Sequence, residues 1–235
     1  MSNKDKELAK VDDTTTLAKS LTEFDPGASD ELFDSSKISI SMLTHVSVPS
    51  GLVTSFTVDD ELVKELIGIV VSADETRVMF PPGSTVGSGE KPLCSAVKEY
   101  GKELTGVGLP GGLCSACEFS KFGSKGKGCA CDERRELFII TADNTIPLRL
   151  SVPPTSLYNW NLHTFKLRQK KLNLFAVWTS FTITTKKGGA GSYGVIVPTF
   201  KEQLSDEELV KYAPIILQLR DLHLPQPKVE DVFEE

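Results

Sequence analysis

The feature that most constrains this chain is a cluster of cysteines in an otherwise cysteine-free sequence. All five lie between positions 94 and 131, and Cys114 and Cys117 form a Cys-x-x-Cys turn. Such a turn places two thiolates at the separation that one tetrahedral ion requires, and zinc readily takes four sulfur ligands. Nearby glycines, such as Gly111 and Gly112, permit the positive-φ bends that wrapping an ion requires. The spacing therefore predicts a structural zinc site.

We predict four zinc ligands: Cys94, Cys114, Cys117 and Cys131. Cys131 is preferred because it leads directly into the apolar segment 137–140, and Cys129 is the alternative fourth ligand. A disulfide framework is disfavoured by the odd number of cysteines and by the lack of a secretion signal. A thioredoxin-type redox pair lacks its βαβ pattern. Catalytic zinc is disfavoured because the three histidines are scattered and no H-x-E motif accompanies the thiols.

Charge is distributed unevenly along the chain. The formal net charge is −6, but the acidic residues gather at both ends, and segment 119–187 contains twelve basic and four acidic residues, a net of +8. A basic centre between acidic ends is typical of a protein whose centre meets a polyanion. The alternative is a solvated basic surface without a partner. Aromatic residues interleave with the bases here, which favours a nucleic acid as the partner.

The hydrophobic pattern predicts a β-rich α+β fold. Alternating segments predict hairpins with turns at 72–75, 143–144 and 186–191, and one central helix over 157–172 capped by Thr155 or Ser156. Ser205 and Glu208 form a capping box that opens a second helix. We expect an OB-like barrel with the cysteine loop inserted between strands.

Four regions follow from this pattern. They are a flexible acidic arm (1–36), an OB-like nucleic-acid-binding domain (37–200) with the zinc insertion at 94–131, a C-terminal helix (201–223) and a disordered acidic tail (224–235).

An OB-type barrel binds single-stranded nucleic acid with a positive groove for phosphates and aromatic faces for bases. The predicted contacts are the basic and aromatic residues Trp160, Lys166, Arg168, Lys170, Lys171, Trp178, Lys186, Lys187 and Tyr193. Structural explanations compete with this prediction. Cations at the end of a helix also complement its dipole, and the helical spacing of Trp160 also suits a core position.

The acidic tail and the cysteine segment together carry a resemblance. The tail consists of Glu230, Asp231, Val232, Phe233, Glu234 and Glu235. It resembles the C-termini of bacterial and phage single-stranded DNA-binding proteins, which end in acids with a terminal or near-terminal aromatic. The cysteine spacing and the Pro-Pro-Thr-Ser turn at 153–156 also look like a set of phage and mobile-element proteins.

The resemblance implies sequence-tolerant binding of single-stranded DNA in the replication or recombination of a virus such as a bacteriophage. It also implies that the tail recruits replication or recombination proteins. The chain departs from the bacterial form in its zinc site and in its final residue, Glu235, which is not aromatic.

Other classes of protein are less well supported. No phosphate loop, Ser/His/Asp set or paired carboxylates are visible, so we do not expect an enzyme. The alternative function is a zinc-knuckle adaptor that binds a host or replication protein without contacting nucleic acid. No apolar run approaches the roughly 20 residues of a membrane span, so we expect no membrane partner and a cytoplasmic location, the host cytoplasm for a viral protein. A homo-oligomer is compatible with this pattern.

Overall fold

The protein is described by a computed structural model that covers residues 43–48, 54–84, 90–144, 146–189, 191–219, 225 and 227–228. The predicted acidic arm, 1–36, lies outside these residues. The strands are β1 (His45–Val46), β2 (Phe56–Val58), β3 (Glu61–Val63), β4 (Glu65–Met79), β5 (Cys94–Val97), β6 (Thr105–Gly108), β7 (Gly112–Leu113), β8 (Asp132–Ile140), β9 (Leu148–Val152), β10 (Val177–Gly188) and β11 (Gly191–Gln203). The helices are α2 (Pro154–Gln169) and α3 (Asp206–Leu219), with short 3-10 turns η3 (Glu118–Ser120) and η4 (Leu174–Ala176).

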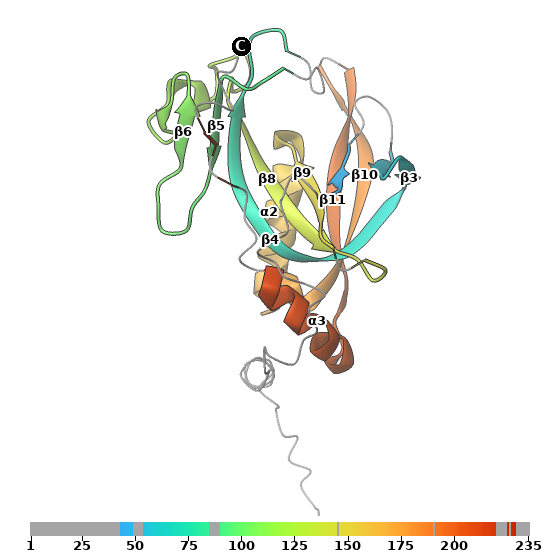
Figure 1. Ribbon diagram of the computed structural model, residues 1–235. Helices are drawn as coiled ribbons and strands as arrows, with labels where there is room; N and C mark the ends of the chain where they lie inside the picture. Colours follow the sequence, from blue (N-terminus) through green and yellow to red (C-terminus); the bar gives the residue numbers. More distant parts are fainter. Residues whose placement is uncertain are drawn as a thin grey trace, which may run out of the picture.

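The fold is β-rich α+β, as predicted, and is built on one mixed sheet (Figure 1). Within the described ranges, the strand order is β1-β9-β8-β4-β5-β6-β7, and β10 joins β4 to β11. The β1–β9 pair is parallel, whereas the other strand pairs are antiparallel. No helix of the described part of the chain is long and apolar enough to cross a bilayer.

Strand β4 connects the two halves of the sheet. Its first residues pair with β10, and its remaining length pairs with β8 and β5. A side chain at Gly68 would place its Cβ atom 2.3 Å from Ile139 Cγ2, so only glycine allows this close approach. A bulge between Val70 and Ser72 adds to the bend that Figure 1 shows in β4.

The hairpin predicted across 72–75 is wrong. Residues 73–75 continue β4, because they pair in register with Leu137, Glu136 and Arg135 of β8. The predicted hairpins of β8 with β9 and of β10 with β11 are present.

The predicted barrel is not closed in the described structure, because the two strands that would close it have other partners. The outer edge of β9 pairs with β1. The edge of β11 is covered by α2, where Ser156 Oγ accepts a hydrogen bond from the Ile196 N–H (2.9 Å) and Asn159 Nδ2 donates one to the Ile196 carbonyl (3.0 Å). Ser156 therefore serves the sheet edge and does not cap α2, which begins two residues earlier at Pro154.

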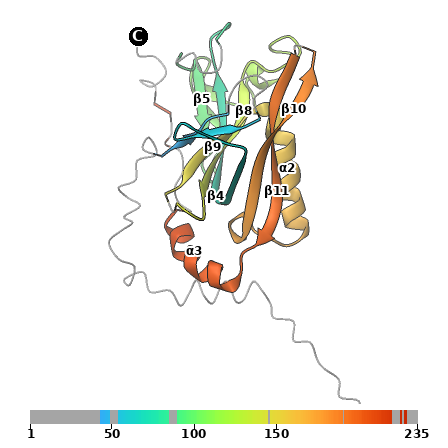
Figure 2. The same ribbon diagram turned by 90° about the vertical axis from the view of Figure 1, so that its right-hand side faces the viewer.

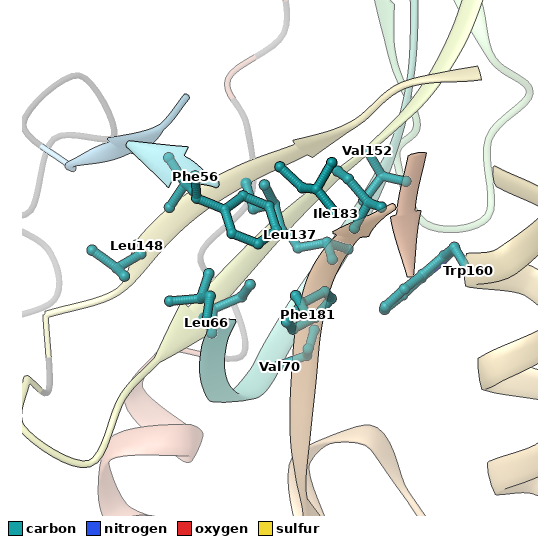
Figure 3. Packing of buried hydrophobic residues seen from close by; sticks show 13 residues of the cluster. Phe56, Leu66, Val70, Leu137, Leu148, Val152, Trp160, Phe181 and Ile183 are labelled. Atoms are coloured by element: carbon teal, nitrogen blue, oxygen red, sulfur yellow. The ribbon is translucent and has the colours of Figure 1, made fainter. Parts of the chain in front are cut away.

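Two hydrophobic clusters hold the sheet and helices together. In the first, Trp160 reaches from α2 towards Phe181 and Val152 (Figure 3). In the second, Trp178 meets the ring of Tyr212 edge to face, with ring centroids 5.6 Å apart, and so ties α3 to the sheet. The first cluster therefore holds α2 against the sheet, and the second holds α3 against it.

The capping box predicted at the start of α3 is confirmed. Glu208 Oε2 accepts a hydrogen bond from the Ser205 N–H at 2.8 Å, and the Glu208 N–H donates to Ser205 Oγ at 3.3 Å. Trp178 Nε1 also donates to Glu208 Oε1 at 2.9 Å. These hydrogen bonds hold the pKa of Glu208 below its usual range.

Candidate metal centre and nucleic-acid surface

Four of the five cysteines line one small cavity. They are Cys94, Cys114, Cys117 and Cys131. The cavity has a volume of about 10 Å³, which is close to the space that one water-sized sphere occupies. Cys129 does not line it. The structure thus brings together the four side chains predicted as ligands and leaves the alternative fourth ligand outside.

Backbone hydrogen bonds bring the four cysteines together from separate elements. The Cys114 N–H donates to the Leu104 carbonyl, and the Cys131 N–H donates to the Phe119 carbonyl, each at 2.9 Å. Ser120 Oγ donates to the carbonyls of Cys114 (2.9 Å) and Cys117 (2.7 Å). The Cys-x-x-Cys turn is therefore fixed at both ends.

Gly106 shapes the wall next to Cys94. A Cβ atom at Gly106 would lie 2.7 Å from Cys94 Sγ, closer than van der Waals contact permits. Burial raises the pKa of the Cys94 thiol, and a hydrogen bond with the backbone of Gly111 offsets only part of this rise. A larger residue at position 106 would therefore have to displace the Cys94 sulfur.

Burial dominates the electrostatics of the thiols. It raises the pKa values of Cys94 and Cys114, and it raises the pKa of Cys131 to about 12. Arg77 acts in the opposite direction on Cys114 and Cys131, but more weakly. A thiolate in this cavity therefore needs a further positive charge beside it, which a bound cation supplies.

All five cysteines are free thiols. No group of three or more His, Cys, Asp or Glu side chains in the described ranges has the geometry of a formed metal site. The shared cavity and the mutual effects of the thiols on one another's pKa values nevertheless place them around a common point. Coordination would require the thiol side chains to turn inward.

The tryptophans predicted to stack on bases lie in the interior. Trp160 is 4% exposed and Trp178 is 5% exposed, each within a hydrophobic cluster. Trp160 packs in the cluster of Phe181 and Trp178 packs against Tyr212, so neither ring has a free face on which a base could stack, although Trp160 also lines the groove described below. Tyr193 is partly exposed.

The predicted cations fall into two groups. Lys166, Arg168, Lys170 and Lys171 are exposed at the end of α2, and Lys186 and Lys187 are exposed at the tip of the β10–β11 hairpin. Lys170 Nζ lies 4.6 Å from the ring centroid of Phe200. Phe200 pairs with Thr179 of β10, and Thr179 lies seven residues before Lys186 on the same strand. Seven strand residues span about 23 Å. One compact groove therefore does not contain both groups.

A larger groove lies between α2, η4 and the middle of β4. It has a volume of about 720 Å³, within the range of about 300–1,000 Å³ typical of ligand sites. Arg135, Arg168 and Phe165 line it together with the polar side chains of Asn161 and Thr164, and no acidic residue lines it. Arg168 forms no ion pair with any described residue, whereas Arg135 contacts Glu133 at 3.1 Å.

Most of the residues that line this groove were not predicted from the sequence. The spacing of Phe165 and Arg168, three residues apart on a helix, was an available signal because such residues are neighbours on the helix surface. Arg135 comes from β8, and no local pattern connects it with α2.

The remaining predicted site is the acidic tail, whose residues 230–235 lie outside the described residues, so partner recruitment by the tail stays a prediction.

No protein-family model, curated protein or solved structure matches this chain.

Proposed function

We propose that the protein binds single-stranded DNA with little sequence preference, and that the groove along α2 is its main contact. The observation that carries this proposal is one groove that combines a guanidinium without an ion-pair partner, an exposed ring and a lining without acidic side chains, all judged on the described residues. Arg168 and Phe165 supply the first two. A replication or recombination role, as the resemblance implies, is part of the same proposal.

The chemistry of the groove suits a strand whose bases are unpaired. Phe165 is 57% exposed, and its ring can stack on a base, an interaction worth about 1–3 kcal/mol. Arg168 can contact a phosphate through its planar fork of donors. The amides of Asn161 and Asn173 offer both donors and acceptors to base edges of any identity.

Strand order supports an OB-type relationship as the finer description of the fold. The antiparallel strands β9-β8-β4-β10-β11 are neighbours in that order, and α2 lies between β9 and β10 in the chain. This order agrees with a partly open five-stranded barrel of the OB type. The connections from β4 to β8 and from β10 to β11, which correspond to the oligonucleotide-binding loops of that fold, lie at the end of the molecule opposite α3 (Figures 1 and 2).

A second candidate function is binding of an extended peptide, as an adaptor would do. Strand β10 pairs with β4 at residues 65–68 and strand β5 pairs with it at residues 76–79, and residues 70–73 between these two pairings line the groove. An extended peptide could lie in the groove against this part of β4.

Charge-matched variants test the proposal. The Arg168→Gln and Lys186→Gln substitutions each remove one exposed cation, the first in the groove and the second at the hairpin tip. Titration of a fluorescently labelled oligo-dT should show weaker binding for Arg168→Gln and near-native binding for Lys186→Gln. The reverse result would move the binding surface to the hairpin. An absence of binding by the unaltered chain at low salt would leave the peptide-binding alternative.

A further inference from the structure

The cysteine lobe, residues 94–131, lacks a hydrophobic core of its own. Its large apolar side chains are mostly exposed, namely Tyr100, Leu109, Leu113, Phe119 and Phe122. Its buried clusters instead consist of cysteines with a few neighbours: Cys94 and Cys131 against Met79, and Cys114 against Ala96 and Leu104. Segments of this size that bury so little usually require a disulfide or a metal ion for stability.

We propose that one zinc-class ion, held by Cys94, Cys114, Cys117 and Cys131 as thiolates, organises the cysteine lobe, and that Cys129 takes no part. These four cysteines line one cavity, and Cys129 does not. As each thiol binds the ion, its proton is released to solvent. This inference does not depend on the nucleic-acid proposal, because none of these residues lines the α2 groove.

The lining of the cavity indicates which ligand fits. Apart from the four sulfurs, the side chains at the wall are those of Met79, Pro110, Phe119 and Ser120, and no carboxylate or imidazole is present. Hard cations such as magnesium and calcium prefer oxygen ligands, whereas thiolates select zinc and similar soft ions. A volume of about 10 Å³ excludes an organic ligand. Four protein ligands leave no open position, so the ion would be structural.

The ion would join three parts of the lobe. Cys94 begins β5, Cys114 and Cys117 flank the turn between β7 and η3, and Cys131 immediately precedes β8. Both tryptophans lie outside the lobe, in the clusters of the sheet and helices. Removal of the ion should therefore loosen the lobe and leave the sheet folded.

The test uses the full, reduced chain and its Cys129→Ser and Cys131→Ser variants, loaded with zinc or with cobalt(II). We expect one zinc per chain in the unaltered protein and in Cys129→Ser, loss of the ion in Cys131→Ser, and a tetrahedral four-thiolate cobalt spectrum. Failure of the reduced chain to bind zinc would overturn the proposal. Loss of the ion in Cys129→Ser, or its retention with native affinity in Cys131→Ser, would do the same.

A second measurement separates a local clamp from a general loss of folding. On removal of zinc by a chelator, limited proteolysis should cut within 94–131 while tryptophan emission stays at its native position. Because this readout needs only the unaltered chain, it stands even where the Cys131→Ser variant does not fold. Unchanged resistance to protease would contradict the clamp, and a red-shifted tryptophan emission would show that the ion holds the whole fold.

Discussion

The buried histidine of α2 should make the stability of the protein depend on pH. His163 is 4% exposed, and its Nε2 lies 3.3 Å from Thr179 Oγ1. Burial and, to a lesser extent, the nearby charge of Lys166 together lower its pKa from the ordinary 6.5 to about 4. The neutral imidazole is thus favoured in the folded state.

The sign and size of the effect follow from these pKa values. Above pH 6.5 the imidazole is neutral in both the folded and unfolded states, so its contribution to stability is fully present. Below pH 6.5 the unfolded state binds a proton first, and the free energy of unfolding falls. The loss approaches about 3 kcal/mol at pH 4, since a shift of one pKa unit corresponds to about 1.36 kcal/mol. That is a substantial part of the roughly 5–15 kcal/mol typical of a folded domain.

The assay is urea unfolding followed by tryptophan fluorescence at several values between pH 7 and pH 4, on the native chain and on His163→Gln. Other groups, including His45 with its lowered pKa, titrate in both proteins and cancel in the difference. We expect the native chain to lose about 3 kcal/mol relative to the variant over this range. Parallel pH profiles for the two proteins would refute the reasoning.

Three further changes have defined outcomes. Gly106→Ala should weaken zinc binding by about 10–100-fold, as changes around metal ligands do. The control Gly128→Ala, whose new Cβ would have no atom closer than 3.7 Å, should leave zinc binding unchanged. Competition with a chelator measures the zinc affinity of both variants. Ser205→Ala should lower the free energy of unfolding by about 0.5–2 kcal/mol, and an unchanged thermal transition would contradict the observed cap. Phe165→Ala should weaken oligo-dT binding by about 1–3 kcal/mol, while the control Tyr158→Ala, on the same helix but outside the groove, should not.

Features set by neighbouring residues could be predicted from the sequence. The capping box at Ser205 and Glu208 depends on side chains three residues apart, and the β10–β11 hairpin depends on alternation on either side of a glycine-rich turn. The choice of Cys131 over Cys129 rested on the apolar strand that follows Cys131, and in the structure Cys131 lines the cavity.

Features decided by distant residues could not be predicted in this way. Residues 72–75 have the composition of a turn, but pairing with β8 keeps them extended. Closure of the barrel depends on whether α2 or β9 meets the edge of β11, and Ser156 and Asn159 of α2 take that place. Trp178 lies between the basic pairs Lys170–Lys171 and Lys186–Lys187 in the sequence, yet Tyr212 of α3 packs against it.

The most direct test of the account is the salt dependence of single-stranded DNA binding by the full chain. The affinity for labelled oligo-dT, measured by fluorescence anisotropy at several salt concentrations, should fall steeply as salt rises. The slope should become shallower by about 0.7 in Arg168→Gln, since each phosphate contact on a single strand contributes about that much. No measurable binding at low salt, or an identical slope in the variant, would contradict the proposed role of the α2 groove.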